Sequence, residues 1–255
     1  MKKAITLMLA MFALSGTAAY ADNHTTGVAQ VFGCTLHEGR TMLDAREILR
    51  DLAANATANP SPDPRWGIFV WLPMRGTSEA DFILGVLNSD LRTMSAGAAA
   101  VAQSEAGQAI TRRMQATADC GSAIMSSEQI ADGAIGMTAD TEVDAIIETF
   151  ACDINSGSDM DDVDKAVAYW QSQYPAIGSE ALESYEAYLW RPIRGGFGND
   201  FYWIGNSPNL ENWGNGLQDY LDSEQGQKAQ ARFDEHSSCT SNMWAGYWLV
   251  VPKEF

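Results

Sequence analysis

The segment Trp71-Leu72-Pro73-Met74-Arg75-Gly76 occurs a second time in the chain, as Trp190-Arg191-Pro192-Ile193-Arg194-Gly195. Tryptophan, proline, arginine and glycine keep their places in both copies, which lie about 119 positions apart. A similarity at a fixed spacing of this size indicates a repeated structural unit, so the flanking sequence should match itself at the same spacing.

Further matches occur in the same order on both sides of this segment. Residues 32–36 correspond to 150–154, and the sequence Ser-Glu-Ala-Gly-Gln at 104–108 corresponds to Ser-Glu-Gln-Gly-Gln at 223–227. The matched single residues are Asp81 with Asp200, Phe82 with Phe201, Arg113 with Arg232, Cys34 with Cys152 and Cys120 with Cys239. We therefore predict a duplicated chain, with one unit over residues 22–140 and a second over 141–255.

Each unit has the same predicted order of elements. Alternating or continuous apolar stretches predict strands at 28–36, 68–72 and 82–87, and at 146–154, 185–190 and 201–204. An amphipathic helix follows the first strand, and a long helical region, which Gly107 and Gly226 should break, follows the third. A last strand is expected within 123–137 and within 244–251. The order β-α-β-β-α-β predicts an α+β, ferredoxin-like unit with a four-stranded antiparallel sheet.

The four cysteines, Cys34, Cys120, Cys152 and Cys239, favour disulfides, since an even number is typical of an exported protein. Two copies of one fold should repeat one bridge, which gives Cys34–Cys120 and Cys152–Cys239. In a ferredoxin-like unit the end of the first strand lies beside the start of the fourth, which suits this pairing. The alternative is a pairing across the two units.

A sheet covered by helices on one face leaves the other face bare, and two copies can cover each other. In element order and duplication the chain resembles the dimeric α+β barrel superfamily in its fused, tandem form. This resemblance implies two antiparallel sheets packed as a pseudo-dimeric barrel. Members of the superfamily include cofactor-free monooxygenases, haem-binding enzymes and stress proteins, and fold alone does not choose among them.

The start of the chain resembles a secretory signal. Lys2 and Lys3 precede a short apolar run, and Ala19-Tyr20-Ala21 offers small residues to a signal peptidase. We predict a signal peptide over residues 1–21 and a periplasmic or secreted protein without a membrane segment after cleavage; the alternative is an uncleaved anchor. The formal charge of −17 disfavours nucleic acid and anionic lipid as partners.

The predicted site is the space between the two sheets, where a small-molecule ligand could bind. The second unit is richer in tryptophan and is the preferred half. The alternative is a filled aromatic core. The strand residues expected in this space are Trp71, Phe82, Tyr188, Trp190, Phe201 and Trp203.

Arg75 and Arg194 are candidates for holding a carboxylate or phosphate of the ligand. Alternatively, each arginine pairs with the following aspartate, Asp81 or Asp200, and fixes a hairpin. His37 could act as an acid or base at the barrel mouth, although a lone surface histidine is the simpler interpretation, as it is for His236.

Two further features concern metals. Cleavage after Ala21 would place His24 third in the mature chain, where a free amine, two amides and an imidazole can bind Cu(II) or Ni(II); coincidence is the alternative. The acidic run 159–164 lacks the glycine and distal glutamate of a calcium loop and is predicted to cap a helix. No nucleotide or zinc-protease motif is present, and the sequence predicts no cofactor.

These observations favour an exported protein that binds a small ligand between the repeats. An α+β barrel enzyme, perhaps oxidative, is one alternative, and a structural or interaction protein with a filled core is another. The sequence leaves enzymatic activity and oligomeric state open.

Overall fold

A computed structural model describes residues 27–76, 78–133 and 145–253. Repeat 1 comprises β1 (Gly27–Leu36), α1 (Met42–Ala58), β2 (Gly67–Arg75), β3 (Phe82–Asn88), α2 (Leu91–Gln103), α3 (Glu105–Gln115) and β4 (Ala118–Ala131). Repeat 2 comprises β5 (Ala145–Ile154), α4 (Met160–Gln173), a 3-10 turn η1 (Tyr174–Ile177), α5 (Glu180–Glu183), β6 (Glu186–Gly195), β7 (Phe201–Ser207), α6 (Leu210–Asp222), α7 (Glu224–His236) and β8 (Ser237–Val250). The predicted signal peptide and the predicted boundary near residue 140 lie outside the described residues.

The eight strands form one closed antiparallel barrel in the order β1-β3-β2-β8-β5-β7-β6-β4. Each repeat contributes four adjacent strands, and the edge strands of the two repeats pair with each other, β2 with β8 and β4 with β6. The predicted barrel of two ferredoxin-like repeats is therefore confirmed. Closure satisfies the backbone groups that the edge strands would otherwise expose.

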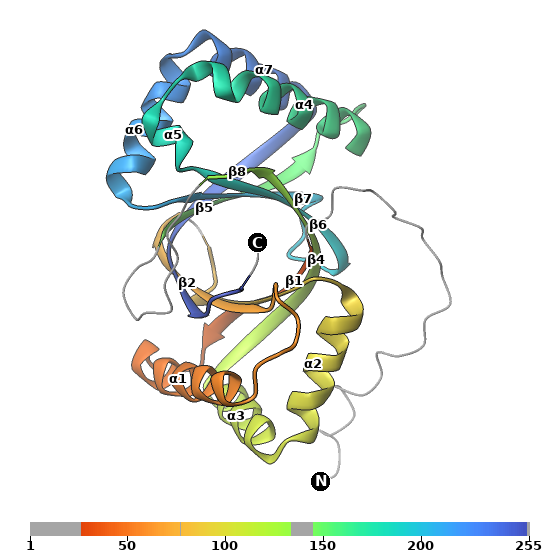
Figure 1. Ribbon diagram of the computed structural model, residues 1–255, viewed down its shortest axis with the longest axis vertical. Helices are drawn as coiled ribbons and strands as arrows, with labels where there is room; N and C mark the ends of the chain where they lie inside the picture. The colour runs from red at the N-terminus through yellow and green to blue at the C-terminus, as the bar shows by residue number, and fades with distance from the viewer. Residues whose placement is uncertain (1–26, 77, 134–144, 254–255) are drawn as a thin grey trace.

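The helices cover the outside of the barrel in two groups. Helices α1–α3 lie against the strands of repeat 1, and α4–α7 lie on the opposite side, against those of repeat 2 (Figure 1). Because successive side chains of a strand point to opposite faces, each strand contributes side chains both to the barrel interior and to an outer core beneath the helices. Across the described residues, no helix combines the length and the apolar character needed to span a bilayer.

Both predicted disulfides, Cys34–Cys120 and Cys152–Cys239, are present. In each repeat the two cysteines lie directly opposite each other in an antiparallel ladder, β1 with β4 and β5 with β8. The last strands begin at Ala118 and Ser237, several residues earlier than predicted. The prediction was late because the first residues of these strands are mostly exposed and polar, so the sequence there lacks a hydrophobic pattern. The bridges indicate a non-reducing environment.

The long helical region breaks at a serine in each repeat, not at the predicted glycine. Ser104 and Ser223 begin α3 and α7, and their hydroxyl oxygens accept hydrogen bonds from the backbone N–H groups of Gly107 and Gly226, at 3.0 and 2.9 Å. The glycines have a different role. A Cβ at Gly107 or Gly226 would collide with the carbonyl oxygen of Val101 or Tyr220 at the end of the preceding helix.

Replacing Gly226 with alanine should therefore lower the free energy of unfolding by about 1–3 kcal/mol, because α7 must move away from α6 to admit the methyl group. Urea denaturation measures the change. Gly97→Ala is the matched control: a Cβ there meets no atom within 4 Å, and the loss of a helical glycine should stabilise by about 0.5–1 kcal/mol. Equal effects of the two substitutions would contradict the close approach.

Candidate ligand pocket in the second repeat

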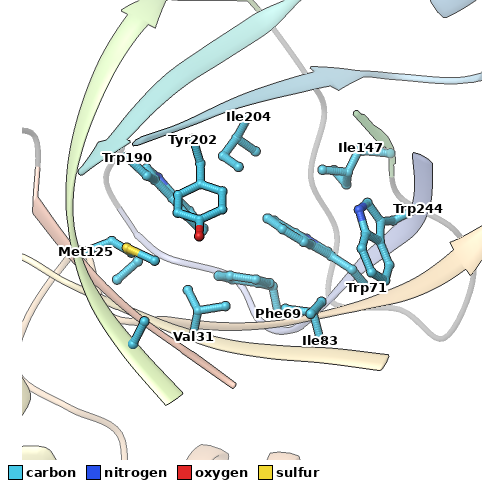
Figure 2. Packing of buried hydrophobic residues seen from close by; sticks show 13 residues of the cluster. Val31, Phe69, Trp71, Ile83, Met125, Ile147, Trp190, Tyr202, Ile204 and Trp244 are labelled. Carbon is cyan, nitrogen blue, oxygen red and sulfur yellow. The ribbon is translucent and has the colours of Figure 1, made fainter. Parts of the chain in front are cut away.

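The barrel interior is a packed aromatic core. Phe69 stacks on Trp71 with ring centroids 4.7 Å apart, and Trp71 stacks on Trp190 at 5.7 Å (Figure 2). The Trp190 indole N–H donates to the Ser127 hydroxyl at 2.9 Å, so its polar edge is satisfied inside the barrel. The cavity that remains at this core has a volume of about 50 Å³. This volume is far below that of a typical ligand pocket, because buried aromatic side chains occupy most of the space around it.

The strand pleat separates the predicted site residues into two groups. Trp71, Trp190 and the partly buried Tyr188 face the barrel interior. Phe82 points outward beneath the helices of repeat 1, and Phe201 and Trp203 point outward beneath those of repeat 2. The prediction that Phe82, Phe201 and Trp203 lie between the sheets is therefore wrong. In β3 and β7 the neighbouring residues Ile83 and Tyr202 point inward instead.

The two predicted arginines lie at the exposed ends of their strands, Arg75 in β2 and Arg194 in β6. The matched aspartates do not pair with them in the described part of the chain. Asp81 accepts a hydrogen bond from the backbone N–H of Leu36 at 2.7 Å, and Asp200 accepts one from Ile154 at 2.8 Å. Each aspartate thus ties the chain before the third strand to the end of the first.

A second, larger cavity lies between the outer face of the repeat 2 sheet and helices α4–α7. It has a volume of about 310 Å³, and we call it the α4–α7 pocket. Eight of its nineteen lining residues are aromatic. The lining residues are Glu148, Phe150, Trp170, Tyr174, Ala181, Leu182, Tyr185, Trp203, Ser207, Asn212, Trp213, Gly216, Leu217, Tyr220, Leu221, Gln230, Phe233, Asp234 and Cys239. This cavity lies in repeat 2, the half that the tryptophan content favours, but beneath the helices and not between the repeats.

Glu148 is the acidic residue on the sheet side of this pocket. It lies in the middle of β5 on the same outward face as Phe150 and Cys152, and its carboxylate accepts a hydrogen bond from the Trp213 indole N–H at 2.9 Å. Burial raises the pKa of Glu148, against smaller lowering effects of the Trp213 hydrogen bond and the Arg75 charge. A carboxyl group whose pKa is raised by burial in a cleft is a candidate for proton transfer.

Tyrosines complete the wall behind Glu148. The Trp203 indole N–H donates to the Tyr185 hydroxyl at 3.0 Å, and this hydroxyl lies over Gly205, where a Cβ would collide with it. Burial raises the pKa of Tyr185 and raises that of Tyr220 to about 12. Both phenols are therefore neutral at physiological pH, whereas Glu148 is an acid of this pocket whose pKa is raised by burial.

The corresponding positions of repeat 1 serve as an internal comparison. Helices α2 and α6 begin after Asp90 and Asn209, and α3 and α7 begin after Ser104 and Ser223, so residues can be matched turn by turn. Aliphatic or methionine side chains of repeat 1 are replaced by aromatic ones in the pocket. The pairs are Leu52 and Trp170, Leu84 and Trp203, Met94 and Trp213, Val101 and Tyr220, and Met114 and Phe233. This comparison, available from the sequence, is the signal by which these residues and Glu148 could have been found.

The other predicted candidates lie elsewhere. His37 is a surface residue whose Nε2 lies 3.2 Å from the Asp119 carboxylate, and the Nδ1 atom of His236 lies 3.0 Å from the Ser158 hydroxyl. Asp159 caps α4 as predicted, accepting from the backbone N–H of Asp162. In the described ranges, no cluster of three or more metal-ligating side chains occurs. His24 lies outside those ranges.

Solved structures of the same fold align with nearly the whole chain. A protein proposed to be a monooxygenase from Fusobacterium nucleatum aligns with a TM-score of 0.59, 10% identity, and coverage of 90% of this chain and 96% of that one. Another protein proposed to be a monooxygenase, from Lactobacillus acidophilus, aligns with a TM-score of 0.58 and 9% identity, and the alignment covers 90% of this chain and 97% of that one. A haem-binding protein from Thermus thermophilus aligns with a TM-score of 0.52 and 8% identity, and the alignment covers 87% of this chain and 91% of that one. No protein-family model and no curated protein sequence matches. At these identities the likeness establishes the fold alone.

Proposed function

Starting from a fused dimeric α+β barrel, we propose that this protein is an enzyme of that fold, which binds a small substrate in the α4–α7 pocket and transfers a proton through Glu148. One observation carries the proposal: a carboxyl group with a raised pKa lies within an aromatic pocket. Repeat 1 has Gln30 at the corresponding position of β1, so the fold itself does not require an acid there.

The surroundings of Glu148 suit general acid–base catalysis. The Trp213 N–H holds one carboxylate oxygen, and the other oxygen can accept a proton from a substrate or return it. The raised pKa makes the carboxylate a stronger base than an exposed glutamate, and the apolar wall limits competition from water. Trp213 is thus proposed as the positioning residue and Glu148 as the group that carries the proton.

Haem, which one protein of the same fold binds, is not supported by the residues of this pocket. An axial ligand would have to be histidine, thiolate, methionine or phenolate. No histidine or methionine is found among the described lining residues, and Cys239 is held in a disulfide. Burial raises the pKa of Tyr174 and of Tyr185, which opposes the phenolate form.

A binding protein without catalysis is the second candidate, because the aromatic wall alone could retain a ligand. Deuterium exchange of benzyl phenyl ketone, a neutral aromatic carbon acid, separates the two. We expect the protein to accelerate exchange of the benzylic C–H in D₂O by about 10²–10⁴-fold, and Glu148→Gln to abolish the acceleration. Proton NMR follows the exchange.

Glu211→Gln, which removes an exposed carboxyl group from α6, is the matched control and should exchange like the wild type. Binding of the ketone is monitored separately by quenching of tryptophan fluorescence. Binding without accelerated exchange would favour the binding protein, and absence of binding would contradict both candidates for neutral aromatic ligands.

The proposal includes export. It is supported by the signal-like sequence at residues 1–21 and by two disulfides, which form in oxidising compartments. The mass of the protein purified from its host should correspond to a chain that begins at Asp22.

A further inference from the structure

We infer that the α4–α7 pocket selects an organic cation, a small alkylated ammonium group that carries an apolar or aromatic substituent. The inference rests on the proposed function, because it takes the same pocket as the substrate site. It adds the chemical class of the substrate, which the proton-transfer role of Glu148 leaves open.

The first support is the arrangement of the aromatic rings. Trp170 and Trp203 meet edge to face, with centroids 4.7 Å apart and planes at 83°, and Trp203 meets Phe233 at 5.6 Å and 89°. The ring planes within these two pairs are nearly perpendicular, so this part of the wall presents ring faces in more than one direction. Ring faces are electron-rich, and several of them around one site attract a weakly hydrated cation such as an alkylated ammonium group.

The second support is the charge of the lining. The described lining residues include two carboxylates, Glu148 on the sheet and Asp234 on α7, and no lysine, arginine or histidine. Asp234 is exposed and accepts a hydrogen bond from Gln230 at 2.8 Å. Arg75 acts on Glu148 from outside the lining, at the exposed end of β2. The ionisable side chains of the lining that can carry a charge at neutral pH are therefore both acidic.

The third support is again the comparison of the repeats. Glu148 corresponds to Gln30, and Asp234, the eleventh residue of its helix, corresponds to Gln115 at the end of α3. Both pocket acids thus occupy positions where repeat 1 has an uncharged glutamine. The fold accepts either kind of residue, so packing alone does not explain the acids, whereas a cationic ligand explains them together with the aromatic substitutions.

A cation also balances the cost of burying Glu148. The carboxylate loses hydration at this position, and a positive charge in the pocket would favour its ionised form. The formal charge of −17 adds an attractive field for approaching cations. The volume of about 310 Å³ leaves room for an ammonium group and one aromatic ring.

Phenyltrimethylammonium and tert-butylbenzene form a matched pair of probes, equal in shape and different in charge. Binding of each to the full, disulfide-bonded protein is measured by quenching of tryptophan fluorescence. We expect the cation to bind at least about tenfold more tightly than its neutral isostere. Glu148→Gln and Asp234→Gln, which introduce the residues of repeat 1, should each reduce this preference while leaving the thermal unfolding midpoint near or above that of the wild type.

Equal or tighter binding of tert-butylbenzene would overturn the cation inference and leave the proposed proton-transfer site standing. Failure of both probes to bind would also overturn it, since the pocket is then no receptor for this class. The proposed function is judged separately, by exchange of the neutral ketone. A preference for the cation that survives the double substitution Glu148→Gln, Asp234→Gln would show that the two acids do not select the ligand.

Discussion

Replacing Cys152 and Cys239 together with alanine should lower the free energy of unfolding by about 4–5 kcal/mol. The bridge joins residues separated by 87 positions, and cross-linking so long a loop removes much of the conformational entropy of the unfolded chain. Urea denaturation of the oxidised wild type and of the double variant measures the difference. Because β2 pairs with β8 and β4 with β6, both repeats should unfold in the same transition.

The other bridge provides the control. Cys34 and Cys120 are separated by 86 positions, so their removal should cost nearly the same free energy. Cys239 also lines the α4–α7 pocket, whereas Cys120 does not, so only the first pair should alter ligand binding. A loss below about 1 kcal/mol for both pairs would show that the ladders β1–β4 and β5–β8 hold these ends together without the bridges.

Truncating Trp190 to alanine should cost about 3–5 kcal/mol of stability. The substitution removes a ring that stacks on Trp71, enlarges the small cavity in the barrel and leaves the Ser127 hydroxyl without its indole donor. Thermal and urea unfolding report the loss. Trp190→Phe, which retains a ring, should lose much less.

The same variant tests where the ligand binds. Because Trp190 belongs to the barrel core and not to the α4–α7 pocket, phenyltrimethylammonium should bind the folded Trp190→Ala protein as it binds the wild type. Loss of binding in a variant that remains folded would return the site to the space between the repeats. Trp213→Met, the residue of repeat 1, should show the converse: weaker binding and little loss of stability.

The fold could be predicted because the duplication presents the same order of elements and the same matched residues twice. Short matches such as the two tryptophan–proline–arginine segments are weak singly, but in register they fix the repeat, the disulfide pairing and, through the bare sheet faces, the barrel. Positions that depend on an exposed polar strand, such as Cys120 in β4, were placed less well, since polar strand ends lack a hydrophobic pattern.

The site was harder to predict because of the pleat. A one-residue difference decides whether a strand side chain faces the barrel or the helices, and Phe201 and Trp203 alternate with inward residues. Glu148 is not found by motif or pattern, because it is a single acid within an apolar strand whose sequence is typical of a buried core. Aligning the repeats shows where they match; the functional information lies in the aligned positions where they differ.

The covalent joining of the two barrel halves has a consequence for how this site could arise. In a symmetric homodimer every substitution occurs twice, so an acid introduced into one sheet would also be introduced into the other. Here Glu148 faces a pocket in one half while Gln30 remains in the other. A single chain is free to break its own symmetry, so one half can serve as scaffold while the other acquires chemistry.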